Sequence, residues 1–253
     1  MKKCCICIFG FICDFTKYIE YMSDIINEYS IKDRFRQFYP VIVDVETAGL
    51  DPKTDALIEV SMMTVKMDEK GMLIPDEQFH ANIRPFPGSL IKQANIDFLG
   101  IDPFDESRNL VSEEEALIPM FKAISKKVKS NKCKRAILVG HNGSFDLGFI
   151  KAATERLNYK RSPFHPFSVC DTASLSMLVY GQSVLVKACI AAGIEFDLDK
   201  AHGAEYDTKM ECQLFCKIFN KFTTFCGVPE PVTEEIDYTK SSSESSDEES
   251  KSE

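Results

Sequence analysis

Residues 41–54 read VIVDVETAGLDPKT, and this stretch decides the fold. Residues 41–45 form a short, largely β-branched run, which predicts a buried strand, and residues 47–54 have the composition of a turn. Asp44 and Glu46 stand two residues apart, so their side chains leave the same face of this strand. Two such carboxylates repel each other and lose hydration, and divalent cations between them would offset both costs. The simpler interpretation is a strand that ends in solvent.

The elements predicted on either side of this strand indicate an α/β protein. Alternating apolar residues at 58–67 and 79–83 predict two strands, and the short connections favour an antiparallel meander with 41–45. A capping box from Ser112 to Glu115 opens a helix of about 18 residues. The remaining expected elements are strands at 136–140 and 167–170 and helices at 144–157, 172–179, 184–192 and 204–222. We therefore expect a mixed β-sheet, an antiparallel meander plus parallel strands, flanked by helices.

Composition divides the 253 residues into three parts. Residues 1–32 form an N-terminal extension with an apolar beginning, and Met22 is an alternative start. Residues 33–229 form the folded domain. Residues 230–253 are rich in serine and acid and predict a disordered tail. This tail contains nine Asp or Glu and two Lys, so it carries −7 of the formal net charge of −9.

The overall composition excludes several classes of protein. With 44% hydrophobic and 27% charged residues, the chain is typical of a globular protein, not of collagen, a coiled coil or a wholly disordered chain. No apolar run is expected to reach the length of a membrane-spanning helix, so no membrane is expected. The ten cysteines are mostly scattered, and Cys4-x-x-Cys7 lacks a second pair, which favours reduced thiols in a cytoplasmic protein over a zinc site.

Three more candidate site residues lie in two later segments. Asp146 ends the sequence HNGSFD, and His202 and Asp207 begin and end HGAEYD. Both aspartates are expected near helix N-termini, where the helix dipole favours an ionised acid. An imidazole can accept a proton from water near neutral pH. Together with Asp44 and Glu46, these residues supply the ligands for two Mg²⁺ or Mn²⁺ ions and a base.

In this order, Asp44-x-Glu46, Asp146 and His202-x4-Asp207 resemble the DEDDh 3′→5′ exonucleases of the RNase H-like superfamily. The surrounding sequence is similar from about residue 33 to residue 220, so the exonuclease domain would be 33–229. The resemblance implies an RNase H-like fold and a two-metal hydrolysis of phosphodiester bonds. The resemblance implies that His202 is the general base. It also places His202 in the metal site, together with the four carboxylates Asp44, Glu46, Asp146 and Asp207.

The resemblance further implies a substrate and a set of alternatives. The expected activity is the trimming of 3′ ends of tRNA and other stable RNAs, with action on single-stranded DNA as well. One alternative is a DnaQ-like DNA exonuclease for proofreading or repair, with the same five residues. The other is a nucleic-acid-binding module that is catalytically silent.

Phenylalanines are the expected contacts for the 3′-terminal bases, because aromatic rings stack on any unpaired base. The family's stacking positions match Phe98, Phe145 and Phe167 here. A fourth such phenylalanine is replaced by Leu50, and a family glutamate that reads the terminal base falls near Gln93 or Ala94. These departures leave discrimination among terminal bases open.

Basic residues form the last expected feature. The family's basic patch falls on five positions, which are Arg34, Arg36, Lys129, Arg135 and Lys160. The resemblance implies a homodimer in which the patch of one subunit feeds RNA to the site of the other. From charge alone, a solvated helix surface explains these residues as well.

Asp171 either supports the site or caps the helix that follows it.

Overall fold

A computed structural model describes residues 30–227 of the chain. The expectations for Met22, for Cys4 and Cys7 and for the acidic tail lie outside the described residues. The boundaries of the exonuclease domain at 33 and 229 stay predictions. Ile31 is buried, with only 3% of its surface exposed, and packs in the main core. The described fold therefore includes residues just before position 33.

The centre of the fold is a five-stranded sheet with the order β3-β2-β1-β4-β5. Strands β1, β2 and β3 pair antiparallel, whereas β1 with β4 and β4 with β5 pair parallel. The strands are β1 Phe38–Thr47, β2 Leu57–Met67, β3 Leu73–Asn82, β4 Arg135–Gly140 and β5 Phe164–Asp171. The expected mixed sheet is thereby confirmed.

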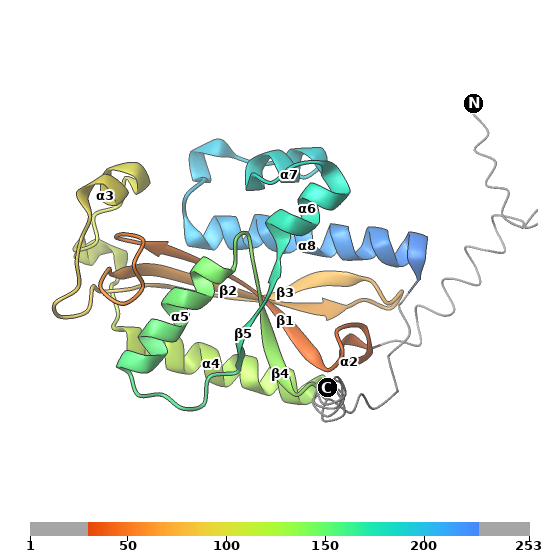
Figure 1. Ribbon diagram of the computed structural model, residues 1–253, viewed down its shortest axis with the longest axis horizontal. Helices are drawn as coiled ribbons and strands as arrows, with labels where there is room; N and C mark the ends of the chain where they lie inside the picture. Colours follow the sequence, from red (N-terminus) through yellow and green to blue (C-terminus); the bar gives the residue numbers. More distant parts are fainter. Residues whose placement is uncertain (1–29, 228–253) are drawn as a thin grey trace, which may run out of the picture.

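Helices cover both faces of the sheet (Figure 1). The long α8 lies along one face, against β1, β2 and β3, while α4 and α5 pack on the other face. The α-helices are α2 Ile31–Arg34, α3 Gln93–Leu99, α4 Glu113–Ser130, α5 Ser144–Arg156, α6 Thr172–Tyr180, α7 Leu185–Ala191 and α8 Ala204–Cys226. Two 3-10 turns, η1 Glu106–Arg108 and η2 Leu198–Lys200, complete the described elements.

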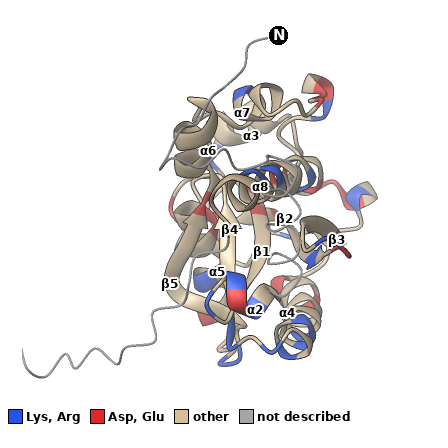
Figure 2. Ribbon diagram, turned by 90° about the vertical axis from the view of Figure 1, so that its right-hand side faces the viewer, with Lys and Arg blue, Asp and Glu red and all other residues tan. Residues whose placement is uncertain are grey.

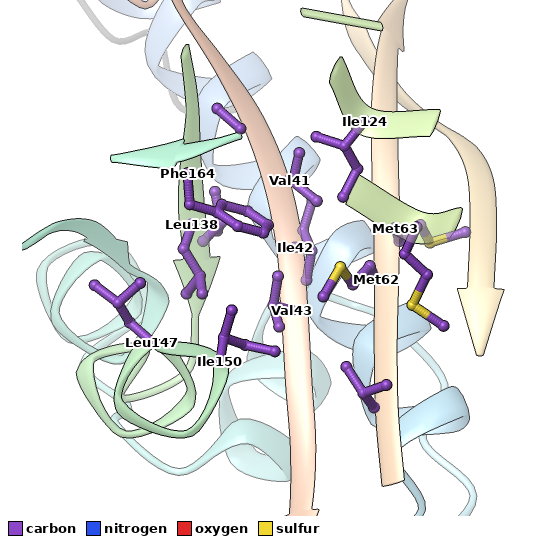
Figure 3. Close-up of a cluster of buried hydrophobic side chains, with 14 of the residues drawn as sticks. Val41, Ile42, Val43, Met62, Met63, Ile124, Leu138, Leu147, Ile150 and Phe164 are labelled. Carbon is purple, nitrogen blue, oxygen red and sulfur yellow. The ribbon is translucent and has the colours of Figure 1, made fainter. Parts of the chain in front are cut away.

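The main core lies between the sheet and its helices (Figure 3). In the centre of β1, Val41, Ile42 and Val43 are all fully buried, as the β-branched run predicts. Because β1 has a neighbouring strand on each side and helices on both faces, it has no route to shift its register. The end of β1, which bears the acidic residues, is therefore held on a rigid base.

The sequence located most elements correctly but missed the first part of β3 and the short helices α2 and α3. Strand β3 begins at Leu73, although the alternating pattern predicted a strand only from residue 79. Helix α3 was not expected, because its seven residues provide no capping side chain and none of them is buried. The capping box of α4 is confirmed, since the Ser112 hydroxyl accepts the Glu115 N–H and the Glu115 carboxylate accepts the Ser112 N–H.

Both edge strands of the sheet are irregular. Strand β3 contains Pro75, and its pairing register with β2 shifts between Met63 and Val65. Strand β5 contains Pro166, and its register with β4 shifts between Ala136 and Leu138. Proline has no N–H to donate, and a bulge bends the strand, so neither edge offers a continuous ladder.

One segment of the described residues, Thr172–Ala191, is long and apolar enough to cross a membrane, with a mean hydropathy of 1.4. This corrects the expectation that no apolar run reaches that length. The match rests on length and composition alone. In the structure the segment is divided into α6 and α7 by Gly181, whose φ is 66°. Ala188 and Cys189 of α7 are buried in a small core that includes α8 residues.

Candidate active site

The acidic end of β1 provides the first two candidate residues. Asp44 pairs with Ser61 and Glu46 with Glu59 in the antiparallel register with β2. The Asp44 Oδ2 atom is buried and has no hydrogen-bond partner among the described residues. An unpartnered carboxylate oxygen in the protein interior is costly, so this atom is suited to a ligand that the protein itself does not supply.

A close approach of two glycines brings Asp146 to the same place. A Cβ on Gly140, the last residue of β4, would lie only 2.4 Å from the Cα of Gly143. Without side chains there, the chain turns sharply and α5 starts against the end of the sheet. Asp146 is 5% exposed, and its Oδ1 accepts the backbone N–H of Val45 at 3.1 Å. The N-terminus of α5 is thus joined directly to β1.

The start of α8 provides His202 and Asp207. His202 has a φ of 63°, a left-handed conformation that is unusual for a residue other than glycine. Its backbone N–H donates to Asp207 Oδ2 at 3.2 Å. The other oxygen, Asp207 Oδ1, is buried without a hydrogen-bond partner in the described part of the chain. The expected positions of Asp146 and Asp207 in the first turns of their helices are confirmed.

Burial raises the pKa values of all four carboxylates, and the charges of other members of the group add to the shift for Asp44 and Glu46. Burial raises the pKa of Asp44 well above its usual value, and the charges of Asp146 and Glu46 add to the shift. Burial, with the charges of Glu59 and Asp207, raises the pKa of Glu46 to about 8. Burial likewise raises the pKa of Asp146 to about 7. Such shifts mean that negative charge gathers here without a balancing cation from the described protein.

The donor set fits a divalent metal ion. Carboxylate oxygens are the ligands that Mg²⁺ and Mn²⁺ prefer, and two of them are buried and unpartnered here. Among residues 30–227, no group of three or more His, Cys, Asp or Glu side chains meets the geometry of a ready-made metal site. The side chains are therefore a cluster of suitable ligands rather than a closed cage.

The three candidate stacking residues differ in exposure. Phe98 on α3 is 67% exposed, and its ring centre lies 4.7 Å from that of His202. Phe167 is 77% exposed, in the irregular part of β5, and contacts the His165 ring. Phe145 on α5 is half-buried and packs against Phe149. Two of the three rings thus have a free face.

Residues near the expected base-reading position are exposed. Leu50 is 74% exposed in the turn after β1. Gln93 and Ala94 are exposed at the beginning of α3, and Gln93 Nε2 donates to Asp97 Oδ1 at 2.8 Å.

Four of the five expected basic residues are exposed. Figure 2 shows Lys and Arg residues gathered around α2 and the adjacent end of α4. Lys129, Arg135 and Lys160, together with Arg161, line a surface depression of about 550 Å³. Arg36 is also exposed. It lies near this depression, since the backbone N–H of Lys134 donates to the carbonyl of Gln37, the next residue after Arg36. Arg34 differs from the others, since its guanidinium donates to the Gly71 carbonyl and to the Thr223 hydroxyl.

Asp171 has a clear structural role. Its carboxylate accepts the Ser174 N–H at 2.8 Å and caps the N-terminus of α6. Its charge also helps to raise the pKa of Asp146, so it lies near the candidate site.

Sequence reasoning missed two buried acids beside the cluster. Glu59 on β2 is 8% exposed and lies opposite Glu46. Glu211 on α8 is fully buried one turn after Asp207, and it accepts the Thr172 hydroxyl at 2.7 Å. The four-residue spacing from Asp207 could have suggested Glu211, whereas only the strand register reveals Glu59.

Comparison with known sequences identifies the family. The family described as "Exonuclease" matches residues 41–215. Ribonuclease T of Escherichia coli (strain HS) is 49% identical over 215 residues, which cover 85% of this chain and all of that protein. Ribonuclease T of Citrobacter koseri is 51% identical over 214 residues, with the same coverage.

Solved structures with the same fold carry far lower sequence identity. The nuclease domain of 3′hExo, a DEDDh family member bound to rAMP, has a TM-score of 0.55 at 18% identity and covers 77% of this chain and 96% of its own. A 3′-exonuclease described with the histone mRNA stem-loop has a TM-score of 0.59 at 16% identity, covering 85% and 74%. These likenesses support the fold, and the sequence matches carry the family. The chain belongs to the DEDDh 3′ exonuclease family, and it is identical to its ribonuclease T relatives at about half of the aligned positions.

Proposed function

We propose that this 3′ exonuclease trims the 3′ ends of tRNA and other stable RNAs and also shortens single-stranded DNA. The observation that carries the proposal is the meeting of four carboxylates, Asp44, Glu46, Asp146 and Asp207, from β1, α5 and α8. Identity of about 50% to ribonuclease T over that enzyme's whole length supports RNA as the substrate.

Membership of this family implies dependence on a divalent metal ion, and we assign the four carboxylates to two Mg²⁺, with Mn²⁺ as an alternative. Two such ions supply a clamp for the attacking and leaving oxygens of a phosphodiester. His202 takes the proton from the attacking water as general base, because an imidazole accepts a proton near neutral pH. Its place just before α8 keeps it beside Asp207.

The exposed rings and basic residues account for substrate binding. The free faces of Phe98 and Phe167 stack on the terminal bases, and Phe145 borders the same site from α5. Lys129, Arg135 and Lys160, with Arg36, bind phosphates of the RNA away from its end. Arg34 is the weakest member of this group, since its donors are already engaged. We further propose a homodimer in the cytoplasm, in which the patch of one subunit serves the site of the other.

The test is the digestion of a tRNA with a 3′ overhang and of a matched single-stranded DNA, each labelled at the 5′ end. We expect stepwise 3′ shortening of the RNA with Mg²⁺ and none with EDTA. A preference for mispaired 3′ ends of duplex DNA would instead indicate a proofreading enzyme. Binding of the RNA without shortening would indicate a binding module.

A matched pair of variants locates the activity at the site. Glu46→Gln removes one carboxylate of the cluster, and we expect turnover to be lost. Glu114→Gln makes the same exchange at an exposed position in the first turn of α4, and we expect unchanged activity. Equal activity in the two variants would contradict the assignment of Glu46.

A further inference from the structure

A buried ion pair lies directly behind the candidate active site. Glu59 on β2 and Arg108 in η1 meet at 2.5 Å between Oε1 and Nη2, and both side chains are mostly buried. Glu59 stands opposite Glu46 across the antiparallel pair, where two like charges would repel. Burial alone raises the pKa of Glu59, but the His80 ring, the Ala204 N–H and the Arg108 charge lower it overall. Glu59 is therefore an ionised carboxylate whose charge is balanced within the protein.

The second oxygen of Glu59 holds the beginning of α8. Glu59 Oε2 accepts the N–H of Ala204, the first residue of this helix, at 3.2 Å. The N-cap residue, Gly203, has no side chain with which to cap the helix. Ala204 is fully buried, so its N–H has no access to water. Glu59 thus acts as the cap of α8 from a distant part of the chain.

His202 lies two residues before that hydrogen bond. It has a left-handed backbone conformation, with φ of 63°, and Gly203 follows it as the N-cap residue of α8. Within the described residues, its backbone N–H donates to Asp207 and its ring packs edge-on against the Phe98 ring. Anchoring Ala204 fixes the first of these contacts, because Asp207 lies in the first turn of α8.

Arg108 bears on the second contact. It donates through Nη1 to the Asp102 carbonyl at 3.1 Å and through Nη2 to Asn82 Oδ1 at 3.0 Å. The segment that contains Asp102 follows α3 directly, and α3 carries Phe98. The Glu59–Arg108 pair therefore contacts both the start of α8, which follows His202, and the segment after α3, whose Phe98 ring lies 4.7 Å from the His202 ring.

We propose that Glu59, through its pair with Arg108, is a positioning residue that sets the imidazole of His202 for catalysis. The inference rests on the proposed function, since it requires His202 to be the general base. Glu59 itself does not contact the substrate in this proposal. Loss of the Glu59–Arg108 pair should therefore slow the chemical step and leave substrate binding intact.

The first test replaces both partners, with Glu59→Met/Arg108→Met. Apolar side chains of similar volume in place of a buried ion pair often leave stability unchanged, whereas Glu59→Met alone leaves Arg108 unpaired. With Mg²⁺ and a 5′-labelled RNA, we expect kcat of the double variant to fall by about 10- to 100-fold. We expect KM to stay within about twofold of the unmodified protein. An unchanged kcat, or a loss confined to KM, would overturn the proposal.

The matched control is Glu113→Met/Arg156→Met. This pair is also a mostly buried Glu–Arg bridge, at 2.6 Å, and joins α4 to α5 away from His202. We expect thermal unfolding of the two double variants to change by similar amounts, and kcat to fall only in the Glu59/Arg108 variant. Equal losses of kcat in both would reduce the effect to general stability and overturn the proposal.

A double-mutant cycle with His202→Ala separates this inference from the proposed function. If Glu59 acts through His202, adding Glu59→Met/Arg108→Met to His202→Ala lowers the residual kcat by less than about twofold. If the kcat losses of His202→Ala and of Glu59→Met/Arg108→Met multiply in the combined variant, Glu59 acts independently of His202. That result would overturn this inference and leave the proposed function standing. Full activity of His202→Ala would overturn the general-base assignment itself, and the inference with it.

Discussion

Acidic side chains crowd together in two regions of this molecule, at the end of β1 and along β3, and the two groups behave in opposite ways. Along β3, Lys127 Nζ lies 2.6 Å from Asp76 Oδ2 and 2.8 Å from Glu77 Oε1, and Lys66 adds a second cation. Burial alone raises the pKa of Asp76, yet the hydrogen bond and charge of Lys127 lower it overall. At the end of β1, the pKa values of Asp44 and Glu46 are raised instead.

The difference shows which acids stabilise the fold and which cost stability. The β3 acids have their cations inside the protein and contribute to its stability. The β1 acids are held together by a rigid strand and two helix N-termini against their own repulsion. Functional sites commonly retain such unfavourable arrangements, because the surrounding structure compensates for them. Three predictions test this contrast, and a fourth applies the same division between stability and activity to two arginines.

The largest expected effect comes from the same exchange made once in each region. Asp44→Asn removes a proposed metal ligand and should lower activity at least about 100-fold. Because a neutral amide relieves repulsion, the metal-free variant should unfold at the same temperature as the unmodified protein or at a higher one. Asp76→Asn should do the reverse, with a lower unfolding temperature and full activity. Activity retained by Asp44→Asn would refute the assignment of that residue.

Without a divalent ion, stability should fall as the pH rises. Glu46 and Asp146 have folded-state pKa values of about 8 and about 7, above their ordinary values of 4.5 and 3.8. Between these limits the folded state binds more protons than the unfolded state, so the free energy of unfolding decreases with rising pH. Thermal unfolding in EDTA should therefore occur at a lower temperature at pH 8 than at pH 5.

Mg²⁺ provides the control for this pH effect. It should restore most of the lost stability at pH 8 and little at pH 5, where protons already neutralise the acids. A stability that rises with pH in EDTA would show that these acids are not repelling one another.

Removing the cation of the β3 region should affect stability alone. Lys127→Met leaves Asp76 buried without its main partner, and we expect a loss of about 1–3 kcal/mol in the free energy of unfolding. Urea unfolding measures this loss, and kcat and KM should be unchanged. Lys126→Met, at the exposed neighbouring position, is the control. A loss of activity in Lys127→Met without a loss of stability would contradict the division between the regions.

The smallest expected effects separate two arginines of the expected basic patch. Arg36→Ala should raise KM. It should also reduce the slope of log KM against log salt concentration by about 0.7, the value for one phosphate contact with a single strand. Arg34→Ala should lower the unfolding temperature instead, because Arg34 donates to Gly71 and Thr223. Measuring KM against salt concentration for both variants tests this. A changed salt slope for Arg34→Ala alone would reverse the assignment.

Local patterns predicted much of the site. The placement of Asp146 and Asp207 in the first turns of helices follows from the residues around them, and the structure confirms it. The same holds for Asp44 and Glu46, since their spacing puts them on one face of a strand whose apolar run is unmistakable. Local spacing is enough wherever a residue and its neighbours belong to one element.

Contacts between distant segments were beyond such patterns. Glu59 reads as an ordinary strand residue until the register places it opposite Glu46 and beneath Ala204. Arg34 has the sequence context of a surface residue, and only the fold brings Thr223 within its reach. The first half of β3 was missed because Pro75 and the charged Asp76 and Glu77 resemble a loop, and Lys127 makes those charges acceptable in a strand.

The two prolines in the edge strands also limit how copies of this chain can assemble. An open sheet edge is a template on which a second chain can add a strand, and it is also a common origin of aggregation. Pro75 and Pro166, with the register shifts beside them, interrupt that template at both edges of the sheet. For the proposed homodimer, we therefore expect an interface built from helices and loops rather than a continuous sheet through both subunits. The same interruptions disfavour edge-to-edge aggregation of the folded domain.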